Sequence, residues 1–383
     1  MTTTSFAARR LPPASRSLFL GLCWLLAAGP ASAEPLAGTA ALAPSLYAVN
    51  DWLYVLQPGA VGLAAIAASS FDAVVIDYSL DGGAAGEMTA AQVSSLKASG
   101  KVVLAYLSIG EAEDYRWYWN PAWNDQPAPD PNAPSWLGPF NPLFPNNYKV
   151  RYWDAGWQAI LFGTPAGPNK SYLDRIVDQG FDGIYLDIID AFTYWDEEGV
   201  RPRAQSRLDM MNLVTALANY ARVNRGRPSF LVFPQNGIDV VRDGADQLDA
   251  AGSSFLATID GVGIEDLFWN ETSPQVPADT TYRLGILDQF QAAGNLVVLV
   301  DYVWDAAAPG GAANISRTND FETRALARGY IPYAGVIDRG LDEIITFAAS
   351  GGLSAAQPKA NGFLVFRDGF EGGSTAAWSL SLP

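Results

Sequence analysis

The feature that most constrains the fold is a regular alternation of short apolar runs with helix-like stretches from about residue 50 onward. Such alternation predicts a parallel α/β fold. Eight runs have the composition of buried strands: WLYVLQ from Trp52, FDAVVIDY to Tyr78, KVVLAYL to Leu107, FDGIYLD to Asp187, SFLVFPQ to Gln235, TIDGVGIED to Asp266, NLVVLVDY to Tyr302 and GYIPYAG near 330–335. Eight strands over roughly 300 residues fit a (β/α)₈ TIM barrel forming a single domain.

The segments between the strands carry helix signals. Thr89 followed by Gln92 is a capping box, and Gly180 follows an apolar helical face as a stop. Apolar residues recur at helical spacing in two longer stretches, Leu208, Met211, Val214, Leu217 and Ala221, then Tyr282, Ile286, Phe290 and Ala293. A doubly wound open sheet is the alternative, and the missing Gly-rich phosphate fingerprint after the first strand disfavours it.

The N-terminal segment has the pattern of a signal peptide. Arg9, Arg10 and Arg16 precede the apolar run LFLGLCWLLAAG, which leads to the small residues ASA at 31–33. We expect cleavage after Ala33 and a secreted or periplasmic protein; the alternative is a leader retained as an anchor. Since the run is shorter than the roughly 20 residues of a membrane span, we expect no stable membrane insertion after cleavage. The predicted organisation is a signal peptide at 1–33, a barrel domain at 46–350 and a short tail at 351–383.

Composition excludes several chemistries. The only cysteine, Cys23, lies in the leader, so disulfides and thiol catalysis are not expected in the mature chain. The absence of histidine among 383 residues excludes His-based triads and HExxH zinc sites. Acid–base chemistry is then expected from carboxylates, with Tyr or Lys as the less favoured alternatives. The net charge of −16 argues against nucleic acid as a partner. We expect a monomer with neither cofactor nor metal.

Polar residues follow the strands repeatedly. In a barrel of this kind the chemistry lies at the carboxyl ends of the strands. The residues placed there are Asp77, Glu111, Asp187, Asp190, Gln235, Asn236, Glu265, Asp266, Asp301 and Tyr302. One acid after a strand is often the cap of the next helix, and Asp190 has that alternative. Recurrence on six strands in succession indicates a functional rim.

The stretch YLSIGEAEDYRWYW, from Tyr106 to Trp119, joins a buried strand to acids, an arginine and several aromatics. This mixture suits a groove for a polar ligand with flat apolar faces, such as a sugar chain. The residues expected to contact it are Tyr106, Glu111, Tyr115, Arg116 and Trp119. The alternatives are an ion pair of Arg116 with Glu113 or Asp114, and packing of about half of the aromatics beneath the loop. The Pro- and Asn-rich segment 120–148 is predicted to be a long βα loop over the barrel mouth.

Two carboxylates stand out within this rim. Asp187 ends the motif GFDGIYLDIID, and Asp190 is close enough to influence its charge. Glu265, near the end of the sixth strand, could face Asp187 across the mouth. Two carboxylates on either side of a glycosidic oxygen are the minimum set for glycoside hydrolysis.

Several motifs in order resemble a known family: VVIDYSLDG, VLAYLSIGEAEDYRWYW, VRYWDAGWQAI, GFDGIYLDIIDAF, FPQNG, GIEDLFW and VDY. Over about residues 48–345 the chain resembles the endo-α-1,4-polygalactosaminidase-like glycoside hydrolases, family 114 and its relatives. It resembles more closely the branch long mislabelled as cysteinyl-tRNA synthetase-related. The resemblance implies a (β/α)₈ barrel that hydrolyses α-1,4-linked galactosamine polymers. It implies Asp187 as nucleophile or electrostatic stabiliser and Glu265 as general acid/base, with exchanged roles as the alternative.

The sequence therefore predicts a secreted glycoside hydrolase that cleaves an aminosugar-containing polysaccharide with a carboxylate pair. The chain departs from the characterised enzymes at Leu186-Asp187-Ile188, where they have Pro-Asp-Asn, and this leaves the substrate more open than the pair. The main alternative is a glycan-binding barrel of the same fold that does not cut. A hydrolase of another bond, such as an ester, is disfavoured because the chain lacks His and an obvious Ser elbow.

Overall fold

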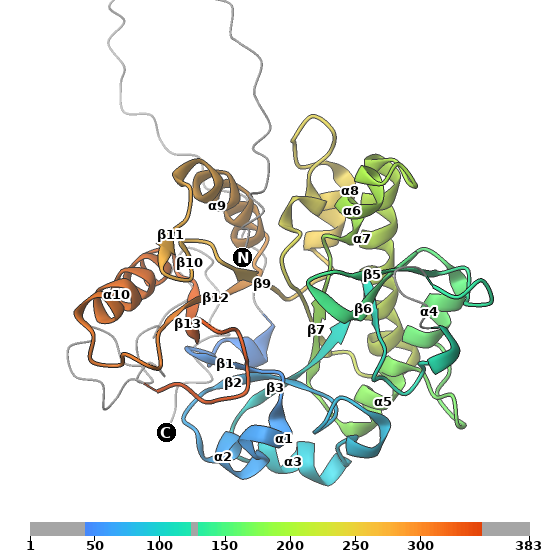
Figure 1. Ribbon diagram of the computed structural model, residues 1–383, viewed down its shortest axis with the longest axis horizontal. Coiled ribbons are helices and arrows are strands. Elements are labelled where there is room, and N and C mark those ends of the chain that lie inside the picture. Colours follow the sequence, from blue (N-terminus) through green and yellow to red (C-terminus); the bar gives the residue numbers. More distant parts are fainter. Residues whose placement is uncertain (1–42, 124–128, 347–383) are drawn as a thin grey trace, which may run out of the picture. The chain divides into compact units, whose positions relative to one another are not determined.

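A computed structural model describes residues 43–123 and 129–346 (Figure 1). The predicted signal peptide at 1–33 and the tail at 351–383 lie outside the described residues. Among the described residues, no helix is both long enough and apolar enough to cross a bilayer.

Eight parallel strands in the described part of the chain form two sheets, with orders β1-β2-β3-β7-β8 and β9-β12-β13. Each predicted run coincides with one of them. Their bounds are β1 (Trp52–Val55), β2 (Ala73–Asp77), β3 (Val102–Ser108), β7 (Gly183–Asp187), β8 (Leu231–Pro234), β9 (Gly261–Glu265), β12 (Leu296–Trp304) and β13 (Ile331–Val336).

Two contacts connect the sheets. A parallel bridge between Gln235 and Gly263 joins the end of β8 to β9. On the other side, the indole N–H of Trp52 in β1 donates to the carbonyl of Ile331 in β13 at 3.0 Å. The first strand therefore lies beside the last, and the strands follow one another in chain order. This is the (β/α)₈ arrangement that the sequence predicted, and it rules out the doubly wound alternative, in which the first and last strands do not meet.

Helices connect the strands, with bounds α1 (Pro58–Val61), α2 (Leu63–Ala68), α3 (Ala90–Ala98), α4 (Ala155–Leu161), α5 (Tyr172–Gln179), α6 (Ala191–Glu197), α7 (Arg203–Asn219), α8 (Ala250–Leu256), α9 (Pro277–Ala292) and α10 (Ala312–Ala327). The predicted Thr89–Gln92 capping box is present at the start of α3: each side chain accepts a hydrogen bond from the backbone N–H of the other residue. Gly180 ends α5 in the left-handed region at φ 89°. The apolar stripe predicted on α9 is wrong at Tyr282, which is exposed and whose hydroxyl donates to Asp246 at the surface.

The segment 120–148 is not an irregular loop. Its described part contains β5 (Leu137–Asn141) and β6 (Phe144–Val150), which form an antiparallel sheet with β4 (Glu111–Glu113) in the order β4-β6-β5. Tyr148 and Val150 are buried while Lys149 between them is less so, as expected for a half-buried strand. The prolines and asparagines of the segment conceal this short alternation.

Aromatic rings fill the barrel interior below the rim. The ring centroid of Tyr54 lies 5.6 Å from that of Trp52 and 5.4 Å from that of Tyr185, and all three residues are almost fully buried. Tyr185 reaches across to β9, where a Cβ on Gly263 would lie 1.8 Å from its hydroxyl oxygen. Glycine at 263 therefore makes room for the tyrosine. The interior is packed, and any cleft has to lie above this layer.

Candidate active site

Asp187 is the last residue of β7, and both of its carboxylate oxygens accept hydrogen bonds. The hydroxyl of Tyr106 in β3 donates to Oδ2 at 2.6 Å, and the backbone N–H of Ile188 donates to Oδ1 at 2.8 Å. Ile188 has φ 61°, a conformation that costs a β-branched residue about 1–3 kcal/mol. Gly110 permits this turn, since a Cβ there would lie 2.2 Å from the Ile188 carbonyl oxygen. The strained turn fixes the direction of the Asp187 carboxylate.

Glu265 ends β9 and is held in a similar way. The hydroxyl of Tyr302 in β12 donates to Oε1 at 2.5 Å, and the side-chain amide of Asn236 donates to Oε2 at 2.8 Å. The Glu265 backbone N–H in turn donates to the Asn236 side-chain oxygen at 3.0 Å. Asn236 and Asp266 both have positive φ, 57° and 50°. Three consecutive barrel strands thus turn through a left-handed residue directly after Asp187, Gln235 and Glu265.

Asp187 and Glu265 point to the same side of the barrel wall. Tyr185 faces inward and reaches Gly263 on β9. Two residues further along each strand come Asp187 and Glu265, and residues two apart on a strand share a face. Their charges interact: burial first, and then the negative charge of Glu265, raise the pKa of Asp187 to about 7. The structure therefore brings together the two carboxylates that the sequence singled out.

Phenols surround this pair. Tyr106 donates to Asp187, Tyr302 donates to Glu265, and Tyr54 donates to the side-chain oxygen of Gln235 at 3.0 Å between them. Burial first, and then the charges of the nearby carboxylates, hold the pKa of these three phenols well above its usual range. They therefore remain protonated donors. Tyr54 was not predicted as a site residue, although the alternation of its strand indicates that it faces inward.

Arg116 lies in a buried ion cluster. Its guanidinium contacts Asp77 at 2.7 Å and Glu113 at 2.6 Å, and only 4% of the residue is exposed. Burial raises the pKa of Asp77 to about 6 against the opposing effect of Arg116. Tyr115, which is exposed, donates to Glu113 at 2.5 Å. The local pairing of Arg116 with Glu113, the alternative considered for this residue, is present and extends to Asp77.

Glu111 anchors the small antiparallel sheet. Its carboxylate is fully buried and accepts from Asn141 at 3.0 Å, Asn147 at 3.2 Å and Lys149 at 2.5 Å. Sequence reasoning missed these three partners because they lie 30 or more residues further along the chain. Trp119 packs on this sheet with its ring centroid 4.6 Å from that of Tyr148.

The remaining predicted residues occupy different positions. Asp190 is exposed at the start of α6 and makes no capping hydrogen bond, and its charge adds to the raised pKa of Asp187. Asp266 pairs with Arg339 at 2.8 Å. Asp301 lies within β12 on the opposite face from Tyr302 and accepts three backbone N–H bonds, from Leu267, Phe268 and Trp269. Asp301 thereby orders the chain that follows Glu265 and is not brought to the carboxylate pair.

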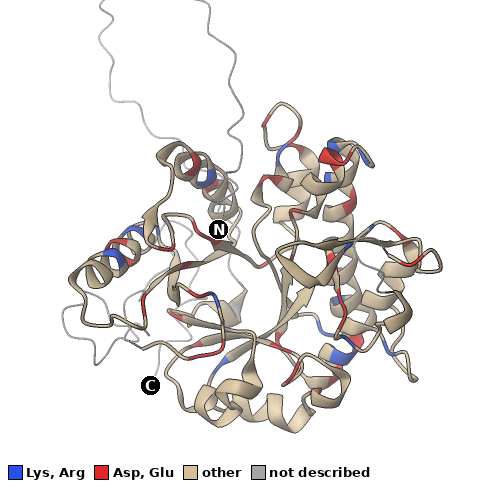
Figure 2. Ribbon diagram, in the orientation of Figure 1, with Lys and Arg blue, Asp and Glu red and all other residues tan. Residues whose placement is uncertain are grey.

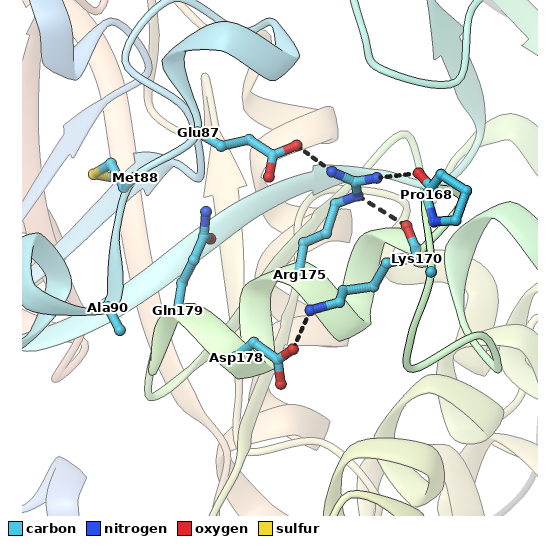
Figure 3. A pocket seen from close by; sticks show the side chains of 9 residues that line it. Glu87, Met88, Ala90, Pro168, Lys170, Arg175, Asp178 and Gln179 are labelled. Atoms are coloured by element: carbon cyan, nitrogen blue, oxygen red, sulfur yellow. Dashed lines mark hydrogen bonds and ion pairs between the residues drawn. The ribbon is translucent and has the colours of Figure 1, made fainter.

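A separate pocket of about 290 Å³ lies between α3 and α5 (Figure 3). Its charged side chains are already paired, Arg175 with Glu87 and Lys170 with Asp178. None of the predicted site residues lines it. Among the described residues, no group of three or more acidic or cysteine side chains is arranged to hold a metal ion.

A (β/α)₈ barrel with two interacting carboxylates at the carboxyl ends of its strands has the architecture of a glycoside hydrolase. The comparison with known families agrees. The chain belongs to glycoside-hydrolase family GH114, whose profile matches residues 31–350.

Its relatives include an uncharacterised protein of Thermotoga maritima, 39% identical over 295 residues, which are 77% of this chain and 83% of the relative. An uncharacterised protein of Methanocaldococcus jannaschii is 38% identical over 296 residues, 77% of this chain and 78% of that protein.

Two solved structures are similar in fold. The glycoside hydrolase domain of PelA from Pseudomonas aeruginosa has a TM-score of 0.49 and 20% identity, covering 77% of this chain and 98% of that one. Ega3 from Aspergillus fumigatus, in complex with galactosamine, has a TM-score of 0.48 and 16% identity, covering 79% and 96%.

Proposed function

We propose that this glycoside hydrolase is secreted and cleaves an aminosugar-containing polysaccharide, in the manner of an endo-α-1,4-polygalactosaminidase, with Asp187 and Glu265 as its catalytic pair. The observation that carries the proposal is the interaction of these two carboxylates from β7 and β9 at the rim of the barrel. The resemblance of the surrounding motifs to polygalactosaminidases supports the substrate class, and the signal peptide predicted at 1–33 supports secretion.

Glycoside hydrolysis needs one protonated and one ionised carboxyl. The raised pKa of Asp187 supports an unequal sharing of protons within the pair. A proton passes to the glycosidic oxygen as its bond to the anomeric carbon breaks. The other carboxylate stabilises or attacks that carbon, and water completes the reaction by delivering a hydroxyl to the sugar and a proton to the enzyme.

The roles of the pair follow from the resemblance, with Asp187 as nucleophile and Glu265 as general acid/base. The raised pKa of Asp187 bears on this assignment. In the protein without substrate it favours a proton on Asp187, so this assignment requires substrate binding to shift the proton to Glu265. The exchanged assignment requires no such shift. A substrate with a good leaving group distinguishes the two assignments. Such a substrate does not need protonation, so a variant without the general acid keeps the rate of the first chemical step, while a variant without the nucleophile loses it.

The charge of the protein is consistent with a cationic polymer. The chain carries 40 acidic against 24 basic residues, and Figure 2 shows the acidic and basic positions spread over many of its elements. Long-range attraction by a negatively charged protein favours encounter with partly deacetylated aminosugar chains, and salt weakens it.

The test is release of reducing ends from galactosamine-rich and other bacterial polysaccharides. Wild type is compared with Asp187→Asn, Glu265→Gln and the matched control Asp288→Asn, an exposed carboxylate on α9. We expect release by wild type and the control only. Equal release by all four proteins would remove the pair from the mechanism. Binding of a polymer without release by any of them would favour the glycan-binding alternative.

A further inference from the structure

The β5–β6 hairpin ends in exposed apolar side chains. Leu143 is 84% exposed and Phe144 is 62% exposed, and both flanking residues, Pro142 and Pro145, are also at the surface. We call Leu143 and Phe144 the hairpin tip. A large apolar side chain left in water beside another one marks an interaction surface more often than an isolated exposed residue does.

This tip is held firmly at its base. Phe144 pairs with Asn141 across the hairpin, and the Leu143 backbone N–H donates to the Asn141 side-chain oxygen at 3.0 Å. The Asn141 amide in turn donates to the fully buried carboxylate of Glu111 at 3.0 Å. The exposed side chains therefore stand on a hydrogen-bonded support and present a preorganised surface.

The support adjoins the catalytic rim. Gly110, the residue before Glu111, packs so closely on the turn after Asp187 that a Cβ there would lie 2.2 Å from the Ile188 carbonyl oxygen and 2.8 Å from the Ala191 Cβ. A short series of contacts thus leads from the carboxylate pair to the hairpin tip.

The tip is uncharged in an acidic protein. No Asp, Glu, Lys or Arg occurs between Asn132 and Tyr148. A net charge of −16 opposes docking on an anionic bilayer and self-association. Two side chains also bury far less than the roughly 1,200 Å² of a stable protein interface. Apolar faces of this kind fit the C–H faces of sugar rings.

We propose that the hairpin tip is an outer binding site for the polysaccharide chain, beyond the sugars at the cleaved bond. This rests on the proposed function and deepens it. The tip would hold long chains and leave short ones unaffected, which favours cleavage within a polymer over cleavage at its ends.

The test compares Leu143→Ser/Phe144→Ser with wild type on a soluble α-1,4-linked galactosamine polymer and on a short oligosaccharide with the same linkage. The matched control is Val223→Ser/Val276→Ser, two other exposed apolar residues (75% and 64%). Loss of one aromatic and one aliphatic contact should raise KM for the polymer on the order of tenfold. We expect kcat of the tip variant for the oligosaccharide to stay unchanged. The control variant should keep both its KM for the polymer and its kcat for the oligosaccharide.

An unchanged KM for the polymer in the tip variant, or an equal rise in the control, would overturn the proposal while leaving the proposed function intact. If wild type cuts no polymer, the proposed function fails, and the tip is judged by co-sedimentation with insoluble galactosamine polymer, which the tip variant should lose. Binding of wild type to phosphatidylglycerol vesicles that the tip variant loses, or a dimer in sedimentation that it abolishes, would assign the tip to those partners instead.

Discussion

Replacing Tyr106 with phenylalanine tests how the barrel tunes its carboxylates. The Tyr106 hydroxyl donates a hydrogen bond to Asp187 at 2.6 Å, and this hydrogen bond opposes the rise in the Asp187 pKa. Phenylalanine removes that donor and keeps the ring. The ionised form of Asp187 then loses stabilisation, so its pKa should rise above about 7.

The expected shift follows from the charge on the acceptor. A hydrogen bond to a charged group contributes about 1.5–3 kcal/mol, and each pKa unit corresponds to about 1.36 kcal/mol. The Asp187 pKa should therefore rise by roughly 1–2 units, whichever of the two carboxylates is the acid.

The assay is the pH dependence of kcat/KM, which reports the ionisation of the free enzyme. In wild type we expect kcat/KM to fall as the pH rises through about 7, because Asp187 then loses the proton that the pair has to supply to the glycosidic oxygen. In Tyr106→Phe this fall should move to higher pH. The control is Tyr54→Phe, whose hydroxyl bonds the neutral amide of Gln235 and should leave the fall in place. A folded Tyr106→Phe enzyme with an unshifted profile would refute the reasoning.

Three further changes have defined outcomes. Arg116→Met leaves the buried carboxylates of Asp77 and Glu113 without their cation and should lower the free energy of unfolding by about 3–5 kcal/mol in urea titrations. Asp187→Asn should unfold at a higher temperature than wild type above pH 7, because the pKa of Asp187 is raised from 3.8 to about 7 on folding and ionisation of this carboxyl therefore destabilises the wild type. The difference in unfolding temperature should shrink as the pH falls and vanish near pH 3.8. A difference that does not change with pH would contradict this. Gly263→Ala places a Cβ 1.8 Å from the Tyr185 hydroxyl oxygen and should destabilise by about 1–3 kcal/mol, with strong coupling to Tyr185→Ala in a double-mutant cycle.

The barrel could be predicted because its strands are apolar runs with clear limits, and because eight of them recur with helices between. The positions of Asp187 and Glu265 at the ends of strands could be predicted since both residues end such runs. The antiparallel sheet of β4, β5 and β6 could not, because prolines and asparagines obscure the alternation around Tyr148 and Val150, and the strands depend on Glu111 for their connection.

Residue roles depended on partners distant in sequence. Asp301 and Tyr302 are adjacent in one strand, yet only Tyr302 faces Glu265 while Asp301 holds the chain after β9. The sequence prediction ended this strand at Tyr302, which placed Asp301 and Tyr302 together at the rim. Because β12 continues to Trp304, the two side chains instead alternate between opposite faces of the strand. Arg116 was assigned to the groove from its neighbours, while its position is decided by Asp77, 39 residues away.

The most direct test of the central claim is titration of the Asp187 carboxyl carbon by NMR, with and without the negative charge at position 265. A coupled pair predicts a pKa near 7 in wild type and a lower pKa in Glu265→Gln, where burial and the charge of Asp190 continue to raise it but the charge of Glu265 is gone. The same pKa in both proteins would show that the two carboxyls do not interact, and the account of this site would be wrong.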